Sequence, residues 1–179
     1  EGIPELLAVL IGLTQQYLQN RLKTTDGPAK GTVLEVKEEP GLGITTNVII
    51  YDGTLKKGDL IVVGAKEKPI VTNIRAVFLP KPLDEIRDPR DKFSSVEYVS
   101  AAAGVKIAAP DLENALAGAP LYAVPSEDQL ETYITLVSDE VQQIKITTDL
   151  DGIILKTDAL GSLEAIADSL RRSDVPIRV

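Results

Sequence analysis

The sequence predicts a mainly β fold: an antiparallel β-barrel preceded by one helix and followed by a second helix and a β-α-β unit. Within residues 30–63, three short strand-like runs are separated by turns that contain glycine. This spacing is typical of small antiparallel barrels or sandwiches. In the first run, one set of residues alternates with a charged set and predicts a strand with one buried face. The expected buried set is Thr32, Leu34 and Val36, opposite Glu35 and Lys37.

The first element is predicted to be an amphipathic helix that begins near Pro4. Proline suits the first helical turn, because its missing N–H would have no partner there anyway. Apolar residues then recur at helical spacing as far as about Leu22, which predicts one apolar face. They are Ile3, Leu6, Leu7, Leu10, Leu13, Tyr17 and Leu18.

Glycine-bearing segments predict three tight turns in the barrel. Asp52-Gly53 predicts a hairpin-type turn, because glycine adopts positive φ without a steric penalty. Residues 57–59, Lys-Gly-Asp, predict a second turn. Residues 41–43, Gly-Leu-Gly, favour a hairpin over a dinucleotide site, because the third glycine and the following helix of such a site are missing.

The rest of the barrel is predicted to hold further strands. One strand is expected over residues 70–78, with Ile74 and Val77 on opposite faces. Residues 83–93 alternate in charge and indicate either a solvated loop with a helical turn or an inserted contact arm. Strands return over residues 96–109, a short turn or helical piece is expected within residues 112–117, and residues 118–124 predict the last strand of the barrel.

A second helix is predicted to follow the barrel. Ser126 and Gln129 form a capping-box pattern. An apolar stripe at helical spacing continues to about Gln143 and consists of Leu130, Ile134, Val137 and Val141. The helix carries much of the acidic excess of the chain, so we interpret it as a linker.

The last segment reads as strand, helix and strand, which predicts one β-α-β unit. Ser162 is expected to cap its helix rather than act as a nucleophile, because no His or adjacent Lys could activate it. A single unit of this kind leaves a sheet edge uncovered. Together with the absence of methionine, even at position 1, this predicts that the sequence is a piece of a longer protein.

Composition excludes several classes of protein. The chain has no Cys and no His, so it lacks a disulfide framework, thiolate metal ligands and the commonest general base. No apolar run is long enough to cross a membrane, and an intracellular, cytoplasmic protein is the simplest interpretation. Net charge is −8, but residues 23–108 hold 13 basic and 12 acidic groups, whereas residues 109–150 hold one basic and eight acidic groups. Any contact with RNA is therefore expected on the barrel.

No catalytic constellation is predicted. A Walker A phosphate loop is absent from the sequence. Adjacent carboxylates, as in Asp84-Glu85 and Glu38-Glu39, point in opposed directions in an extended chain and suit solvation better than acid–base chemistry. We therefore predict no catalytic, cofactor-binding or metal-binding residue in this chain.

Several motifs carry a resemblance to a known family. The strand that begins Lys30-Gly31-Thr32-Val33, and the Lys-x-Gly-Asp turn at residues 56–59, resemble the second domain of translational GTPases. Residues 41–45 and 48–55 narrow the resemblance to translation initiation factor 5B of archaea and eukaryotes, a relative of bacterial initiation factor 2. Residues 158–165, Asp-Ala-Leu-Gly-Ser-Leu-Glu-Ala, resemble the start of the third domain of that family.

The resemblance covers nearly the whole chain and implies four segments. Residues 1–22 would be the C-terminal helix of a GTPase domain, and residues 23–125 the β-barrel domain of the translational GTPase second-domain type. Residues 126–150 would be a linker helix, and residues 151–179 the truncated start of an α/β third domain.

The resemblance also implies a function for the parent protein, a ribosome-dependent GTPase that uses GTP and magnesium. It would promote the joining of ribosomal subunits and help to position initiator tRNA. This chain would be a non-catalytic, monomeric part without a cofactor or a membrane partner, and its barrel would contact small-subunit ribosomal RNA. The alternative is a stand-alone β-barrel ligand-binding protein or enzyme unrelated to translation, against which the missing His and Cys and the unfinished C-terminal unit argue.

Lysines near the glycine turns are the candidates for contact with ribosomal RNA, because a lysine on a tight turn can approach phosphate closely. The alternative is that they keep the sheet edges soluble. The barrel candidates are Lys30, Lys37, Lys56, Lys57, Lys66 and Lys68, and the candidates on the charged arm are Arg87, Arg90 and Lys92.

Overall fold

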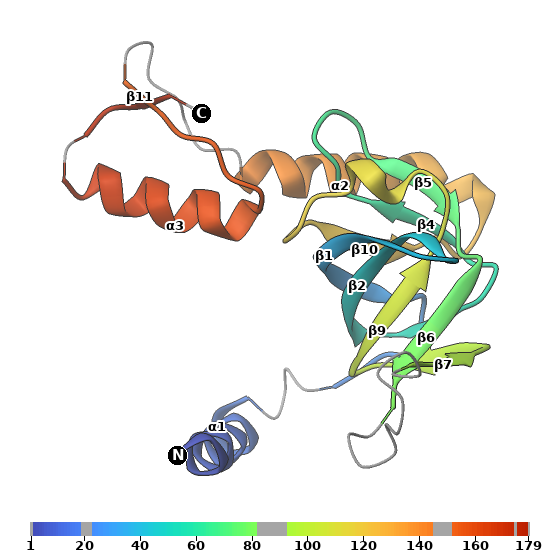
Figure 1. The fold of residues 1–179 in the computed structure, drawn as a ribbon. Helices are drawn as coiled ribbons and strands as arrows, with labels where there is room; N and C mark the ends of the chain where they lie inside the picture. Colours follow the sequence, from blue (N-terminus) through green and yellow to red (C-terminus); the bar gives the residue numbers. More distant parts are fainter. Residues whose placement is uncertain (1, 19–22, 82–92, 145–151, 174, 179) are drawn as a thin grey trace.

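The computed structural model describes residues 2–18, 23–81, 93–144, 152–173 and 175–178. Its main body is an antiparallel sheet of eight strands in the order β5-β4-β10-β1-β2-β9-β6-β7, which wraps around a core (Figure 1). The strands are β1 Lys30–Glu39, β2 Gly43–Asp52, β4 Leu60–Val63, β5 Ile70–Asn73, β6 Ala76–Pro80, β7 Phe93–Val96, β9 Ala103–Ala108 and β10 Pro120–Ala123. A second sheet pairs β3 Thr54–Lys56 with β8 Tyr98–Ser100. The predicted fold class is confirmed.

The described helices precede the sheet, follow it or, in the case of η1, connect β9 to β10. They are α1 Ile3–Tyr17, the 3-10 helices η1 Leu112–Asn114 and η2 Glu127–Gln129, α2 Leu130–Ile144 and α3 Leu160–Arg171. The helical piece expected after residue 112 is therefore present as η1. Two short strands, β11 Ile153–Ile154 and β12 Ile177–Arg178, pair in parallel around α3 and confirm the predicted β-α-β unit.

The main hydrophobic core lies inside the barrel. Its fully buried side chains include Val33, Val48, Ile50, Ile107 and Leu121, which come from β1, β2, β9 and β10. Every buried member of this cluster lies within residues 29–123. Among the described residues, the core of the barrel is therefore built from the barrel itself.

A bulge in β1 changes which residues face this core. The pairing of β1 with β2 shifts register between Val33 and Glu35, so Leu34 is the extra residue. Val33 is buried and Val36 packs against the core, whereas Leu34 is 52% exposed. The prediction that Thr32, Leu34 and Val36 share the buried face is therefore wrong, because simple alternation does not continue through the bulge.

Gly53 marks a corner of the chain rather than a hairpin. β2 pairs with β1 and β9, but β3 pairs with β8, so the strands on either side of Gly53 do not pair with each other. Gly53 has φ of 73°, and a Cβ there would overlap the carbonyl oxygen of Pro28. The hairpin predicted at residues 41–43 is present, since β1 and β2 pair up to Glu39 and Gly43.

The single strand predicted over residues 70–78 is divided. β5 pairs with β4 and β6 pairs with β9, and Ile74 and Arg75 lie between them. The amide of Ile74 donates to the carbonyl of Asp59 and the amide of Arg75 to that of Ala108, so the backbone changes partner here. Ile74 and Val77 consequently face the same core, contrary to the prediction.

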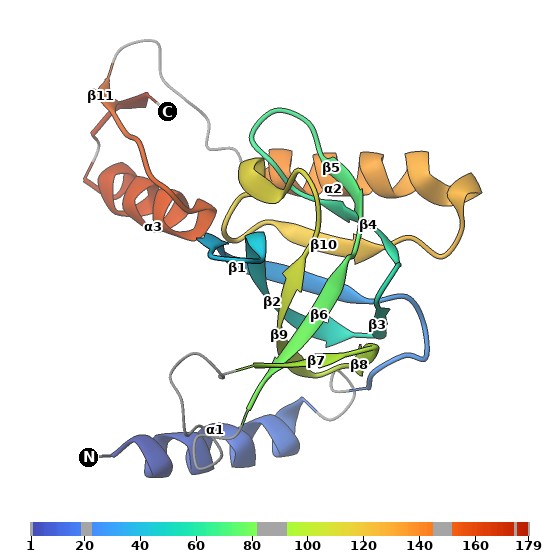
Figure 2. The same cartoon turned by 45° about the vertical axis from the view of Figure 1, so that its right-hand side comes forward.

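Helix α2 packs on the outer side of β10 (Figure 2). A second hydrophobic cluster joins Val62, Tyr122 and Val124 of the barrel to Val137 and Val141 of α2. The predicted apolar stripe is confirmed. The predicted side-chain capping box is not formed, because Ser126 occupies the N-cap position of η2 without a side-chain hydrogen bond.

The β-α-β unit touches the barrel through the start of α3. Leu160 is buried in the second cluster, and its amide donates a 3.0 Å hydrogen bond to the carbonyl of Ala117. Ala159 is the N-cap residue of α3, so Ser162 lies inside the helix and the prediction that it caps the helix is wrong.

Helix α1 lies apart from the sheet (Figure 2). Pro4 sits in its first turn, as predicted, and none of the helix residues is buried. Its apolar side chains are at least 49% exposed from Ile3 to Leu13. No helix among the described residues is long and apolar enough to cross a membrane.

Candidate nucleic-acid interface

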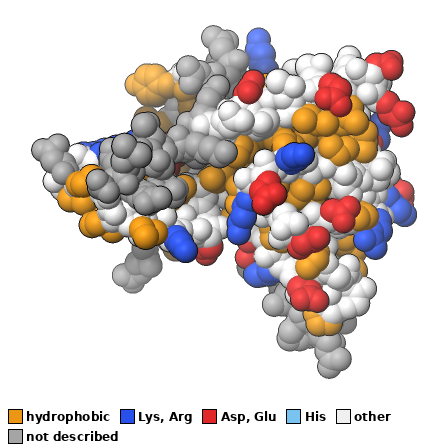
Figure 3. Space-filling model, turned by 90° about the horizontal axis from the view of Figure 1, so that it is seen from above, with side chains coloured by type: hydrophobic (Ala, Val, Ile, Leu, Met, Phe, Trp, Pro, Cys, Tyr) orange, Lys and Arg blue, Asp and Glu red, His pale blue; other side chains and the backbone are white. Residues whose placement is uncertain are grey.

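The predicted RNA-contacting lysines of the barrel fall in separate places. Lys37 lies near the β1–β2 hairpin, and Lys66 and Lys68 lie on the connection between β4 and β5. Lys56 and Lys57 lie at the end of β3. On the face shown in Figure 3, acidic and basic side chains are interspersed. The arm candidates Arg87, Arg90 and Lys92 lie outside the described residues.

Three of these lysines form ion pairs with nearby carboxylates. The Nζ atom of Lys30 is 3.2 Å from Asp52, that of Lys37 is 2.8 Å from Glu35, and that of Lys57 is 3.5 Å from Glu97. Within the part of the chain that the structure describes, Lys56, Lys66 and Lys68 have no such partner. These three exposed lysines carry ammonium groups that no carboxylate of the described residues neutralises.

The ion pairs of Lys30 and Lys37 have structural consequences. Thr25 donates its backbone N–H to Asp52 at 2.6 Å, and this bond, aided by Lys30, lowers the pKa of the Asp52 carboxyl. Lys37, aided by a 2.5 Å bond from Asn47, lowers the pKa of Glu35. These lysines therefore already pair with carboxylates that hold the segment before β1 and the β1–β2 hairpin.

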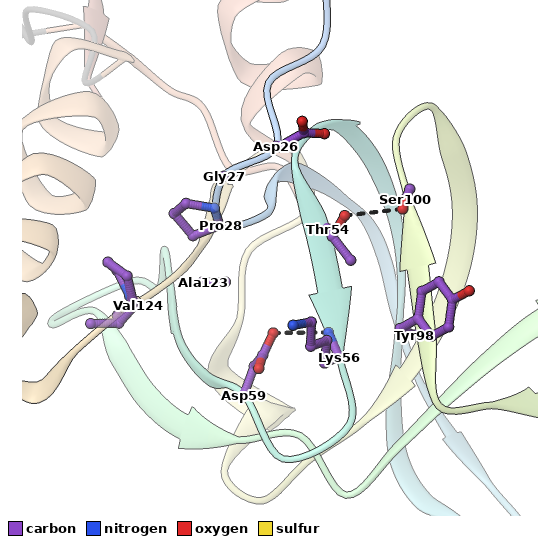
Figure 4. A pocket seen from close by; sticks show the side chains of 11 residues that line it. Asp26, Gly27, Pro28, Thr54, Lys56, Asp59, Tyr98, Ser100, Ala123 and Val124 are labelled. Carbon is purple, nitrogen blue, oxygen red and sulfur yellow. Dashed lines mark hydrogen bonds between the residues drawn. The ribbon is translucent and has the colours of Figure 1, made fainter.

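Lys56 lies in the wall of a groove of about 670 Å³ (Figure 4). Strand β3 forms one side, and the segment from Asp26 to Pro28, with Ala123 and Val124, lies across the groove from it. The groove lies between the segment that precedes β1 and the end of β10. This volume is in the range of small-molecule sites in proteins.

The groove has a polar wall with an exposed aromatic residue on its rim. Lys56 and Tyr98 are directly opposite each other in the β3–β8 pair, on the outer face, and Tyr98 is 65% exposed. The hydroxyls of Thr54 and Ser100 lie 3.0 Å apart on the same face (Figure 4). Beneath this face, Leu55 and Val99 are buried in the core and hold the two strands in place.

The predicted turn at residues 57–59 fixes the backbone of Lys56. The carboxylate of Asp59 accepts a 2.8 Å hydrogen bond from the backbone N–H of Lys56, and Gly58 has φ of 91°. The turn therefore fixes the backbone of Lys56 at the end of β3. The side chain of Lys56 extends over the groove (Figure 4).

One buried cation was not predicted from the sequence. Lys106 on β9 is 4% exposed, pairs with Glu39, and lies 3.8 Å from the ring centroid of Phe93. It ties the turn end of the β1–β2 hairpin to β9 and β7 and is not accessible to phosphate. Only its position within an apolar run, residues 103–109, could have distinguished it from the surface lysines.

The described residues offer recognition chemistry. They contain no group of three or more Asp, Glu, His or Cys side chains placed to hold a metal ion. They do present unpaired ammonium groups, hydroxyls and an exposed phenol ring, which are groups that contact phosphate, sugar and base in nucleic acids.

Comparison with known proteins gives a consistent result. Residues 43–122 match the family model of elongation factor Tu domain 2. The chain is 56% identical, over all 179 residues, to a probable translation initiation factor IF-2 of Staphylothermus marinus, and 57% identical over 178 residues to that of Thermococcus kodakarensis. It spans 30% and 16% of the lengths of these two proteins.

A solved structure shows the same arrangement. The crystal structure of GDP-bound aIF5B from Aeropyrum pernix superimposes on the chain with a TM-score of 0.86 and 51% sequence identity. The match covers the whole of this chain and 30% of that protein.

Proposed function

The chain is homologous throughout to one segment of the archaeal translation initiation factors named IF-2 and aIF5B, and on this basis we propose that it serves translation initiation as a non-catalytic part of a GTPase. The observation that carries the proposal is the sequence match to these relatives. It extends over the entire chain, and more than half of the aligned residues are identical. The parent protein would bind GTP with magnesium in a part that this chain does not include, and would act in the cytoplasm.

The parent would promote the joining of ribosomal subunits and help to position initiator tRNA. In this scheme residues 1–22 form the last helix of the GTPase domain, residues 23–125 the barrel domain, residues 126–150 a linker helix and residues 151–179 the start of the third domain. The exposed apolar side chains of α1 support the first assignment, because a face of this kind requires a packing partner. The self-contained core of the barrel supports the second.

The barrel would contact RNA of the small ribosomal subunit. Support comes from the unpaired lysines, which lie on turns or at strand ends of the barrel, while the acidic helix α2 covers the outer side of β10. Phosphate contacts of this kind release counterions, so binding must weaken as salt rises. The chain acts in this role as a monomer without a membrane partner.

Co-sedimentation with purified archaeal small ribosomal subunits tests the proposal. The 179-residue chain should pellet with the subunits at low salt and be released as salt rises. A chain that never pellets with small subunits, even at low salt, would contradict the proposed contact. Large subunits provide the comparison that separates a specific contact from general attraction to RNA.

A further inference from the structure

We propose that the groove beside β3 binds one unpaired nucleotide of RNA, with its base stacked on Tyr98 and its phosphate paired with Lys56. The inference rests on the proposed function, because it names the element of RNA that one surface of the barrel would take.

The shape of the groove suits a nucleotide rather than a helix of RNA. Its volume is about 670 Å³, and Pro28, Ala123 and Val124 lie across it from β3. A single base with its sugar fits within a site of this size, whereas a duplex presents a broad convex surface. Recognition of RNA in loops and bulges relies on bases that have left the stack.

Tyr98 supplies a stacking platform. Tyr98 is 65% exposed although it sits in a paired strand. The next residue of that strand, Val99, is buried in the core. The main chain of Tyr98 is therefore held rigidly while the ring remains free on the rim (Figure 4). Aromatic side chains in this situation stack on bases of any type.

Lys56 supplies the charge beside that platform. It is the cross-strand partner of Tyr98, so its ammonium group and the ring reach the same side of the sheet. Within the described residues it has no carboxylate partner, in contrast to Lys57, whose Nζ lies 3.5 Å from Glu97. Its charge is thus available for a phosphate next to the stacked base.

The carboxylates of the groove favour one nucleotide over a long strand. Asp26 and Asp59 both line the groove, and they would repel a continuous run of phosphates. Each can accept a hydrogen bond from a sugar hydroxyl or from the amino group of a base. The mixed charge therefore fits a base and its sugar within the groove and a single phosphate at Lys56.

The test is a titration of the 179-residue chain, followed by its backbone NMR shifts. The probes are a short unpaired RNA of mixed sequence and the same RNA annealed to its complement. The unpaired RNA should shift resonances around Thr54, Lys56 and Tyr98, and the duplex should bind this site much more weakly. Shifts confined to other surfaces, or equal response to both probes, would overturn the proposal.

Variants make the test residue-specific. Tyr98→Ala should weaken binding of the unpaired RNA roughly tenfold, and Tyr98→Phe should retain it, because base stacking needs the ring and not the hydroxyl. Lys56→Glu should also weaken binding. The matched controls are Tyr17→Ala, at 71% exposed, and Lys156→Glu on the β-α-β unit, which should leave it unchanged. A Tyr98→Ala variant that binds as the wild type does would refute the stacking role.

The same variants separate this inference from the proposed function. If small subunits bind the wild type and Tyr98→Ala equally, the groove proposal fails and the subunit contact stands. If the wild type binds no subunits but binds unpaired RNA through Tyr98, the proposed function fails and the groove proposal stands. A library of peptides is tested as a competitor of the RNA probe. If peptides displace the probe equally well from the wild type and from Tyr98→Ala, the groove is a protein-binding site and the proposal fails.

Discussion

The hydroxyl of Tyr122 on β10 donates a 2.6 Å hydrogen bond to a carboxylate oxygen of Glu140 on α2. The ring of Tyr122 also lies 5.9 Å from that of Tyr133 on the same helix, tilted by 53°. This polar and aromatic contact crosses the boundary proposed at residue 125. Glu140 is therefore part of the packing of α2 on the barrel and not simply one of the solvated charges of an acidic linker.

Tyr122 should make stability depend on pH in the alkaline range. Burial, and then the hydrogen bond to Glu140, raise the pKa of Tyr122 above its ordinary value of 10.0. The folded state thus keeps a proton that the unfolded chain loses above about pH 10, so the stabilisation is present below that pH and is lost as pH rises. Tyr122→Phe should be ~1 kcal/mol less stable near neutral pH.

Urea unfolding near neutral pH and above about pH 10 measures this effect. The stability advantage of the wild type over Tyr122→Phe should shrink in the alkaline sample. Tyr17→Phe, on the exposed face of α1, serves as the control and should differ from the wild type at neither pH. An advantage that is constant across this range would show that Tyr122 keeps no proton preferentially in the folded state.

Ending the chain after Val124 should leave a barrel that unfolds cooperatively, but at a lower temperature than a chain that ends after Ile144. The main core is complete within residues 29–123 and survives the cut. The second cluster loses Val137 and Val141 and exposes Val62 to water. Calorimetry of the two chains checks both statements, and a broad transition for the shorter chain would contradict the proposed domain boundary.

A point variant tests the contribution of α2 without a truncation. Val137 is fully buried between α2 and β10, so Val137→Ala should cost ~2 kcal/mol in unfolding free energy. Its neighbour Leu136 is 40% exposed, and Leu136→Ala should cost much less. Equal losses for the two variants would mean that α2 does not pack on the barrel in solution.

The spacing of apolar residues predicted the helices and strands well. It predicted less well which side chains of a strand face the core. The helical stripe of α2 and the β-α-β unit are where the pattern placed them. Alternation failed at Leu34 and at residues 74–75, because a bulge in β1 and a change of pairing partner after β5 interrupt it. Both events depend on strands that are distant in sequence, which a local pattern does not contain.

Pairing between distant residues also limited the prediction of the site. Lys56 and Tyr98 are far apart in the sequence, and only the β3–β8 pairing puts them side by side. In the sequence, Lys106 resembles a surface lysine. In the structure it is buried, because β9 lies between β2 and β6 in the sheet. The residue types were visible in the sequence, but their exposure and neighbours were not.

Gly53 should be far less tolerant of substitution than Gly41. Both have positive φ, of 73° and 82°, so alanine costs roughly 1–2 kcal/mol at either position from backbone strain. At Gly53 the new Cβ would also overlap the carbonyl oxygen of Pro28, whereas nothing lies within 4 Å at Gly41. Thermal unfolding of Gly53→Ala and Gly41→Ala should therefore show the larger loss for Gly53→Ala, and similar losses would contradict the corner geometry.

The 179-residue chain should not bind GTP. The sequence contains no Walker A pattern, so no phosphate loop is available to hold the nucleotide. Calorimetric titration with GTP and magnesium should give no saturable heat, and the intact parent protein provides the positive control. Saturable binding to this chain at micromolar concentration would contradict the assignment of GTP binding to another part of the parent.

Reversing the charge of Lys56 and Lys57 together should weaken binding to small ribosomal subunits and reduce its dependence on salt. Among the described residues, Lys56 has no carboxylate partner and Lys57 has one exposed contact, 3.5 Å from Glu97, so both ammonium groups can reach phosphate. Each lost phosphate contact lowers the slope of log affinity against log salt by about 0.7–0.9. Glu131→Gln on the exposed side of α2 is the matched control and should change neither quantity. If the double variant keeps the affinity and the slope of the wild type, the RNA contact does not lie at the end of β3, and the charged residues 83–93 become the next surface to test.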